Sequence, residues 1–468
     1  TYDGFWEDWL TFGDGPRELP AAYDPFLGGS GFNPTTTQMR QLVASQPINW
    51  NVFGATAPPN LSFDGYVGDT WGPFGFNLAG AYGWKFQVNR DEVLNGFQSE
   101  DQIRDNGGER FIYDRSTFET QLGAVLTTRY RPDRDHQVFA RGLVNRQGID
   151  EVLNGSGTDF ANEAQVTQFA TSSQYTTNQL GMGQLEGSHH FDWLDVDWRT
   201  SWAPSTQEQP DTKFFVYTQS KESPQPPVLN VVRTSQVQPP QRTYTSLDEF
   251  LQDYYLDAIV PFRTRLPFID VWRGLAAQLK VGANYMLRDR SFSFLSFRDS
   301  GTATAPQLDL AQQPNGILVP GNFSTTGPLV LSISGDEPFD ANQEIAAGYG
   351  MIELPLIEDR LRFVGGSRLE YSYLTTMGRQ RSAGFVTTIL NDLDPLPSAN
   401  LVYTPRDDMN IRGVFSQTVS RPEFRELTPT QFPTLPGERT LQGNPSLVTT
   451  NITNYDLRWE WFFSPLEL

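Results

Sequence analysis

Residues 408–429, DMNIRGVFSQTVSRPEFRELTP, are the stretch from which the fold can be inferred. Successive side chains of a β-strand point to opposite faces, so every second residue shares a side. Between residues 409 and 420 this rule separates an apolar face from a polar one, with Val414 and Gln417 as exceptions. The apolar face carries Met409, Ile411, Gly413, Phe415 and Val419, and the polar face carries Asn410, Arg412, Ser416, Thr418 and Ser420. Pro422 has no N–H for a strand ladder, so we expect the strand to end there.

A second strand with the same alternation is predicted at residues 454–463. Its apolar face carries Tyr455, Leu457, Trp459, Trp461 and Phe463, and its polar face carries Asn454, Asp456, Arg458 and Glu460. A soluble sandwich packs its apolar faces together in the core and seldom has aromatic residues at this density. Large aromatic residues on one face and charges on the other are typical of a transmembrane β-barrel, in which the outer face touches lipid and the inner face is polar.

Composition is consistent with such a barrel and excludes several alternatives. The 468 residues are 38% hydrophobic and 13% aromatic, with a formal net charge of −20. A chain this acidic would repel the phosphates of nucleic acid, so we expect no nucleic-acid partner. No window approaches the roughly 18 apolar residues that a membrane helix needs. The sequence has no cysteine, which excludes disulfides and zinc–thiolate sites and suits a protein that crosses an oxidising periplasm.

The spacing of strands and connections predicts a single domain, 1–468, which is part of an outer-membrane β-barrel. We predict about thirteen antiparallel strands between residues 60 and 468, joined alternately by short turns and long loops. The long loops are predicted at 1–59, with a short helix near residues 37–44, and near 91–115, 149–165, 204–248, 299–340, 380–395 and 421–449. Alternate connections of a closed sheet lie at opposite rims, so this sorting matches short periplasmic turns and long extracellular loops.

The predicted chain starts outside the cell, crosses the membrane an odd number of times and ends on the periplasmic side. Such a chain cannot close a barrel that has both termini in the periplasm. We therefore expect at least one strand before Thr1 and more after Leu468, within a larger barrel.

The charged residues on the polar faces are the candidate site. They could line a solute path, or they could pair with each other and hold a plug; for any one residue we favour the second interpretation, because a large plugged barrel needs many such contacts. The residues are Arg129, Arg199, Lys280, Arg288, Arg362, Arg368, Arg412, Asp456, Arg458 and Glu460.

No catalytic, metal or cofactor site is predicted. His189 and His190 lie near Asp192, Asp195 and Asp197, and imidazole with carboxylate suits several divalent ions. We interpret this segment instead as a polar turn that runs into a strand, and no serine nearby completes a hydrolase triad. Four aromatic residues of the first loop could stack on a sugar, grip a partner or pack within their own loop; they are Phe5, Trp6, Trp9 and Phe12.

Several segments, taken together and in order, resemble the barrel of TonB-dependent outer-membrane transporters. They are 11–20 TFGDGPRELP, 340–345 DANQEI with 354–356 LPL, 415–427 FSQTVSRPEFREL, 443–447 GNPSL and 453–457 TNYDL. The most specific positions of this family motif are Arg421, Pro422, Glu423, Phe424, Arg425, Glu426, Gly443, Asn444 and Pro445. The resemblance covers the barrel portion only, because these residues contain no counterpart of the plug, the TonB box or the aromatic-terminated last strand.

The resemblance implies a 22-stranded, plugged barrel in the outer membrane of a Gram-negative bacterium. It implies import of a scarce nutrient, such as a siderophore, vitamin, glycan or peptide, without enzymatic activity. Implied partners are outer-membrane lipid, the plug domain, the TonB complex, and lipoproteins or other outer-membrane proteins that join such barrels. The alternative is a structural or interaction barrel whose large loops bind a partner protein or surface layer without active transport. A plug and a TonB box in the flanking sequence would favour import.

Overall fold

The computed structural model describes residues 6–13, 15–27, 32–47, 49–54, 56–96, 109–159, 166–222, 225–232, 239–265, 273–302, 305–380, 384–432 and 441–462. Within these ranges, thirteen strands follow one another in a single antiparallel sheet. They are β1 (Leu61–Trp71), β2 (Phe74–Gly96), β3 (Glu109–Tyr130), β4 (His136–Asp159), β5 (Val166–Phe191), β6 (Leu194–Ser220), β8 (Gln241–Arg265), β9 (Arg273–Gly301), β11 (Phe339–Ile357), β12 (Leu361–Gln380), β13 (Gly384–Arg406), β14 (Met409–Ser420) and β17 (Thr450–Trp461).

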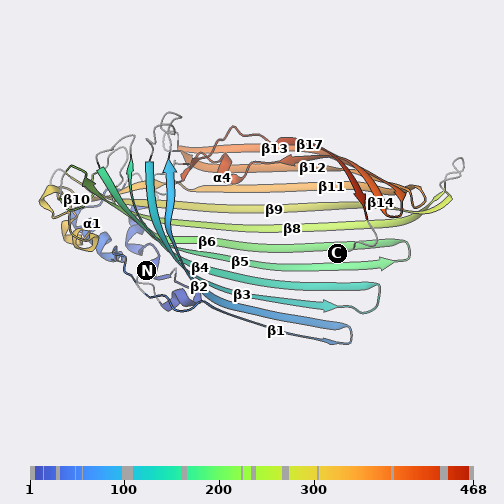
Figure 1. Ribbon diagram of the computed structural model, residues 1–468, viewed down its shortest axis with the longest axis horizontal. Coiled ribbons are helices and arrows are strands. Elements are labelled where there is room, and N and C mark those ends of the chain that lie inside the picture. The colour runs from blue at the N-terminus through green and yellow to red at the C-terminus, as the bar shows by residue number, and fades with distance from the viewer. Residues whose placement is uncertain are drawn as a thin grey trace.

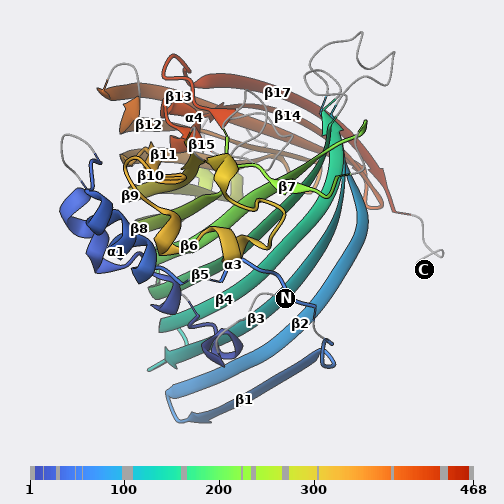
Figure 2. The ribbon, with the colours of Figure 1, turned by 90° about the vertical axis from the view of Figure 1, so that its left-hand side faces the viewer.

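The sheet bends into an open arc with β1 at one end and β17 at the other (Figures 1 and 2). Each strand of the path pairs with its neighbour in sequence order, as in a meander. Two short strands extend the sheet: β7 (Val228–Leu229) pairs with β6, and β10 (Leu329–Asp336) pairs with β9. The predicted antiparallel barrel wall and its thirteen strands are confirmed for the described residues.

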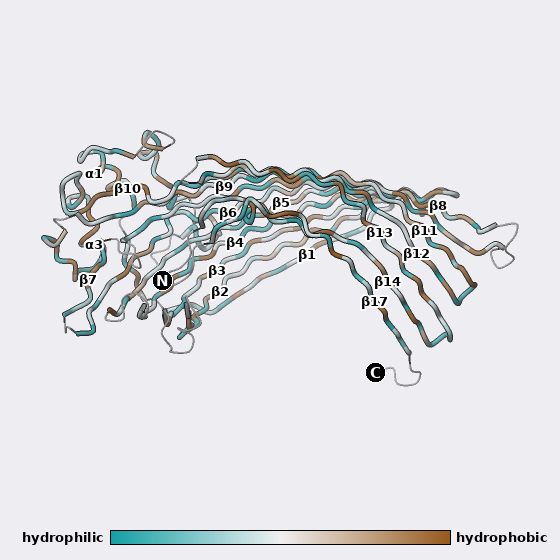
Figure 3. Tube along the Cα trace, turned by 90° about the horizontal axis from the view of Figure 1, so that it is seen from above, coloured by the Kyte–Doolittle hydropathy of each residue, from teal (hydrophilic) through white to brown (hydrophobic). Residues whose placement is uncertain are grey.

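Hydrophobic and hydrophilic residues follow one another along these strands (Figure 3), and successive side chains of a strand point to opposite faces. The outer face is defined here as the one that carries Leu279, Val281 and Tyr285 of β9, and its apolar side chains remain exposed. On β17 the exposed fractions of Tyr455, Leu457 and Trp459 are 80%, 81% and 62%, so these side chains are not sealed inside a sandwich. The apolar side of β9 runs from Leu279 to Leu287. For a strand tilted by about 40°, this stretch rises roughly 20 Å along the barrel axis. That height is close to the roughly 25 Å apolar band of an outer-membrane barrel.

The predicted loops near 204–248 and 380–395 are largely strand, which is a correction. β6 continues to Ser220 and β13 begins at Gly384. β2, β3 and β4 likewise extend into the predicted loops near 91–115 and 149–165. The strands were predicted from the alternation of apolar and polar residues. This alternation fades beyond the apolar band, because both faces of the sheet meet water or folded loops there. The connections at one rim are therefore shorter than predicted where the strands extend into them: only residues 381–383 separate β12 from β13.

β13 contains two prolines. Pro395 and Pro397 lie inside this strand and pair with residues of β12. On its other side β13 pairs with β14 only between Ser398 and Arg406. Both prolines therefore occupy a part of β13 that is a sheet edge, where a missing N–H is tolerated.

Two outer segments pack together at the long-strand rim. The first contains η1 (Trp6–Leu10), η2 (Gly15–Arg17), η3 (Ala21–Phe26) and α1 (Thr36–Ser45), which covers the helix predicted near 37–44. The second contains η5 (Ala305–Gln307), α3 (Pro314–Ile317) and η6 (Pro320–Asn322). Their shared core includes Tyr23, Met39, Leu42, Trp50, Phe297, Ile317 and Phe323. No helix in the described ranges has the length and apolar character needed to cross a membrane.

The last long loop lies between β14 and β17. It holds α4 (Phe424–Leu427) and a small ladder of β15 (Gln431–Phe432) with β16 (Leu441–Gln442).

Candidate functional site

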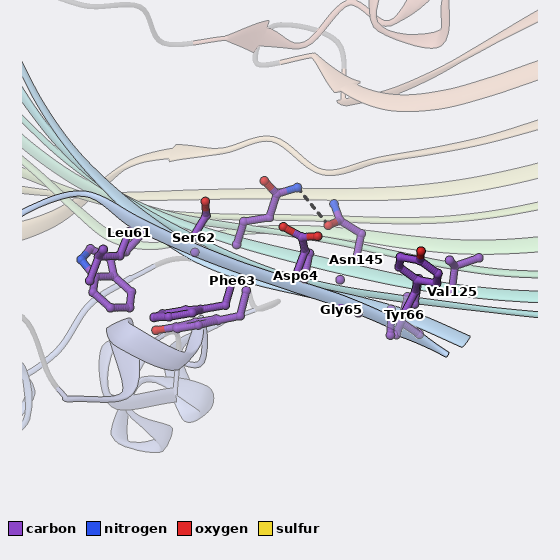
Figure 4. A pocket seen from close by; sticks show the side chains of 18 of the residues that line it. Leu61, Ser62, Phe63, Asp64, Gly65, Tyr66, Val125 and Asn145 are labelled. Carbon is purple, nitrogen blue, oxygen red and sulfur yellow. Dashed lines mark hydrogen bonds between the residues drawn. The ribbon is translucent and has the colours of Figure 1, made fainter. Parts of the chain in front are cut away.

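All ten charged residues of the candidate site lie on one face of the sheet, called the inner face here. Directly paired residues of neighbouring strands project to the same side. Arg368 pairs with Tyr349, which pairs with Gly282 between Lys280 and Asn284 on the same side of β9. The same register places Arg129 opposite Phe139 and Asp456 opposite Val414. In Figure 4 the inner-face residues Asp64 and Asn145 project to one side of the sheet, and Phe63 projects to the other.

Lys280 belongs to a three-strand cluster. Its Nζ lies 3.0 Å from Oδ2 of Asp257 on β8, and the Tyr349 hydroxyl on β11 donates to Oδ1 of Asp257 at 2.6 Å. The Asp257 carboxylate therefore joins β8, β9 and β11 across the inner face.

Arg368 belongs to a second network. It forms an ion pair with Glu370 and donates to Oδ1 of Asn284 at 3.2 Å, and Asn284 donates to Asp253 at 2.7 Å. Glu370 also faces Arg421, which is the first residue of the family motif.

Arg421 bridges two carboxylates that are paired directly across β12 and β13. Its Nη1 donates to Glu370 at 2.6 Å and its Nη2 donates to Asp394 at 2.7 Å. All three side chains are largely buried. Two carboxylates this close would repel each other without the guanidinium between them.

Arg288 belongs to a third cluster, which surrounds Phe424. Arg288 and Arg290 both donate to Glu249, at 2.8 and 2.7 Å, and their guanidinium carbons lie 4.9 and 5.2 Å from the centre of the Phe424 ring. Glu423 approaches Arg288 at 3.4 Å. Two motif residues are therefore held by cations of the inner face.

The remaining candidates form smaller contacts. Arg362 pairs with Glu353 at 3.0 Å, and Glu460 forms ion pairs with both Arg412 and Arg458, at 3.0 and 2.8 Å. Arg199 stacks over the Tyr255 ring at 4.5 Å.

The family motif folds the 421–449 loop onto the inner face. Glu423 and Glu426 form the capping box of α4, which buries Phe424 and Leu427 against Phe339 and Leu374. A Cβ on Gly443 would clash with the carbonyl oxygens of Thr428, Arg425 and Glu426, so only glycine fits. The Asn444 N–H donates to the Glu426 carbonyl at 2.5 Å. Pro422, Arg425 and Pro445 lie within this same turn-rich segment.

The two histidines considered for a metal point to opposite faces. His190 contacts Asp195 directly across β5 and β6 on the inner side. His189 lies on the outer side, where it accepts from Trp198 at 3.2 Å and lies 3.4 Å from His136. Within the described ranges, no three His, Asp or Glu side chains converge as a metal site.

The first-loop aromatics divide into two groups. Trp9 packs against the rings of Trp84 and Phe118, at 5.6 and 4.8 Å between centroids, whereas Trp6 and Phe12 are exposed. Phe5 lies outside the described residues.

Two clefts lie away from the charged clusters. A cleft of about 650 Å³ is formed by β1 to β4 at the β1 edge (Figure 4). Another of about 980 Å³ lies between the first loop, β8, β9 and β10.

Of the carboxylates that hold these cations, the sequence identified Glu460 but not Asp257, Glu249, Glu353, Glu370 or Asp394. Asp257 and Glu249 share a strand and a face, so alternation along β8 could have identified them. Asp394 fell in a predicted loop, and its role could not be seen from the local sequence.

Comparisons with known proteins support an outer-membrane barrel. Residues 321–466 match the family model described as "Outer membrane protein beta-barrel family". No curated protein sequence matches the chain. Among solved structures, the chain is similar to "Crystal structure of the siderophore receptor PiuA from Acinetobacter baumannii", with 11% identity, a TM-score of 0.38 and coverage of 88% of this chain and 56% of that one. The chain thus spans little more than half the length of that receptor.

The family match, the antiparallel sheet and the exposed apolar band define a β-barrel protein. It is located in the bacterial outer membrane.

Proposed function

We propose that this protein is a TonB-dependent receptor that imports a scarce nutrient across the outer membrane. The observation that carries the proposal is the charged inner face, which runs from Arg129 on β3 to Glu460 on β17. A barrel of more than about eight strands is too wide to be filled by its own side chains and holds water or a plug. Thirteen strands of such a wall, counted within the described ranges, already exceed that width.

The ion pairs of the inner face leave polar groups available to a plug or a solute. Arg362 and Arg458 are paired but remain 54% and 65% exposed. Exposed ion pairs are weak, so hydrated cations and carboxylates can replace their mutual contacts by hydrogen bonds to a mobile partner at little cost in free energy. This supports an inner face that binds reversibly.

The folded 421–449 loop gives a second line of support. Arg421, Phe424 and Gly443 fix it against the inner wall, so it narrows the passage near the long-strand rim. These are the positions that resemble the transporter family, and their role here is to shape the barrel interior. Because these positions resemble that family, the proposal includes energy coupling to the TonB complex.

We also propose that the protein acts without catalysis. The His190–Asp195 contact lies at the short-turn rim, next to the 192–193 connection. The other inner-face clusters described above hold carboxylates against arginine or lysine, and such ion pairs suit binding and structure more than proton transfer.

The test is loss of uptake in the native host. We expect a strain lacking the gene to lose growth on one class of scarce nutrient among ferric siderophores, cobalamin, glycans and peptides. A strain lacking TonB should show the same loss, and the intact gene should restore growth only where TonB is present. Unchanged uptake of every class, with a weakened envelope or lost binding of a partner protein, would instead favour the structural barrel.

A further inference from the structure

The segment of residues 6–12 lies on the outer face of β2, β3 and β4. The Trp9 ring packs against Trp84, Phe86 and Phe118, with centroids 5.6, 5.9 and 4.8 Å away. Phe86 and Phe118 are direct partners in the register, Trp84 pairs with Thr120, and all of them share the face of Leu78 and Leu122. The segment therefore covers the side of the wall that faces away from the barrel interior.

Hydrogen bonds fix the segment at this position. The Thr120 hydroxyl donates to the Asp8 carbonyl at 2.9 Å, and Nε of Arg146 donates to the Thr11 carbonyl at 2.8 Å. The Arg146 guanidinium also lies 4.6 Å from the centre of the Phe12 ring. The Tyr82 hydroxyl donates to the Trp9 carbonyl. Backbone groups of the segment are satisfied by three different strands.

The contacts give the height of the segment. Thr120, Trp84 and Arg146 are each ten positions from the short-turn end of their strands, at Tyr130, Phe74 and His136. Ten residues of a strand extend about 33 Å, and a tilt of about 40° reduces this to roughly 25 Å of rise. The apolar band of such barrels is also about 25 Å tall. The segment thus lies at the outer boundary of the hydrocarbon.

The side chains that the segment exposes suit that boundary. Trp6, Leu10 and Phe12 are 69%, 46% and 51% exposed. The carboxylate of Asp8 is turned away and buried against Arg17, with two contacts of 2.6 and 2.9 Å. Thr11, at a left-handed φ of 69°, allows the reversal that leaves Leu10 and Phe12 on the surface.

This apolar surface is continuous with the lipid-facing band. Phe63 and Val67 of β1 pair with Tyr82 and Leu78 of β2, and all four lie on the outer face. Phe63, Val67 and Leu78 are exposed. In Figure 4 Phe63 projects to the side of the sheet on which the N-terminal segment lies.

We propose that residues 6–12 are an interfacial lipid anchor of the first outer loop. Trp6, Leu10 and Phe12 lie among the headgroups and first acyl carbons of the outer leaflet, where tryptophan and other aromatic side chains are favoured. The partner is lipid. The anchor holds the loop that carries η2, η3 and α1 against the membrane surface, independently of what the barrel transports.

These 468 residues contain no cysteine, so within them a thiol-reactive label attaches only at the introduced position. Trp6→Cys, Leu10→Cys and Phe12→Cys are labelled with a nitroxide in the full-length protein, in phosphatidylcholine nanodiscs. Accessibility to oxygen, which concentrates in lipid, is compared with accessibility to a water-soluble nickel chelate. Leu78→Cys is the control within the band, and Val448→Cys, 71% exposed in the last outer loop, is the control in water.

We expect the oxygen-to-nickel ratio at positions 6, 10 and 12 to exceed that at Val448 several-fold and to stay below that at Leu78. A ratio equal to that at Val448 would overturn the proposal, and so would protection from both reagents, which would indicate a protein cover. The substituted side chains are exposed, and heat-modifiable migration of each variant in detergent gels checks that the barrel has folded.

Discussion

Arg421 shows how one residue can determine the course of a loop. It lies between Glu370 and Asp394 on neighbouring strands, away from bulk water, and Arg368 supplies the second positive charge that balances the two carboxylates. Removing one partner of a buried ion pair leaves an uncompensated charge, which costs far more than the pair itself contributes.

We expect Arg421→Ala to release the 421–449 loop from the inner face and to cost about 3 kcal/mol in the folded barrel. Limited proteolysis within the loop and urea unfolding in lipid vesicles would measure the two effects. Arg458→Ala is the matched control, because Arg458 is 65% exposed and should cost less than about 1 kcal/mol. Equal behaviour of the two variants would contradict the role given to Arg421.

Gly443 is the second residue on which this loop depends. We expect Gly443→Ala to open the loop locally while the barrel stays folded, because a Cβ would collide with three carbonyl oxygens of the chain before it. Proteolysis of the loop should accelerate with unchanged heat-modifiable migration. Gly413→Ala, which meets nothing within 4 Å, should behave like the native protein; the same acceleration in both would refute the steric argument.

Asp150 links the first loop to pH. It lies on β4 beyond the apolar band, and burial raises the pKa of this carboxyl to about 7, although the Arg17 charge opposes the shift. Between about pH 4, the ordinary pKa of a carboxyl, and about pH 7, Asp150 therefore carries a proton in the folded state that it has lost in the unfolded state. Docking of the first loop should weaken as pH rises through this window and then level off.

Protease protection of residues 6–27, measured from pH 5 to pH 8, would show this decline. Asp150→Asn keeps the neutral form at every pH, so its protection should change little across the range. Asp64→Asn alters an exposed carboxyl and should retain the native profile. A native profile in Asp150→Asn would mean that another group titrates.

At the scale of elements, the strands are longer than a membrane requires. β6 has 27 residues, and roughly a third of such a strand crosses the apolar band. The remainder extends outward and serves as a wall on which the outer segments pack. The first loop is attached to this wall by buried polar contacts as well as by apolar packing, with Arg17 at the centre.

We expect Arg17→Ala to detach the first loop. Arg17 pairs with Asp8 and stacks over Tyr175 at 4.1 Å, and all of these groups are largely buried. Loss of the guanidinium removes the buried ion pair with Asp8 and the stacking on Tyr175, and should cost roughly 3 kcal/mol of local stability. Hydrogen exchange of residues 6–27 would report the loss, and Glu18→Ala, at an exposed neighbour, should leave exchange unchanged.

At the scale of the whole molecule, one sheet separates two environments. Asp456 and Leu457 are adjacent, yet they face the barrel interior and the lipid respectively. We expect a water-soluble maleimide to label Asp456→Cys and to leave Leu457→Cys unlabelled in membranes. After detergent extraction and unfolding both should react. Equal labelling of the two in intact membranes would contradict a lipid-facing outer surface.

The sequence by itself determined the class of fold. Alternation at residues 409–420 and 454–463 predicts two unlike faces, and a face with Tyr455, Leu457 and Trp459 exposed is stable only against lipid. Face assignment is a local property, because the period of a strand is fixed by its own backbone. The sequence also identified the cations of the inner face, since they follow the same period.

Tertiary structure decided which groups meet. Tyr82 bonds to Trp9 from 73 residues away, and Arg421 reaches Glu370 across 51. Such contacts depend on the curvature of the sheet and on how the outer loops fold back, and no local pattern records either. The strand ends beyond the membrane were decided in the same way, because water on both faces removes the alternation that marks a strand inside the hydrocarbon.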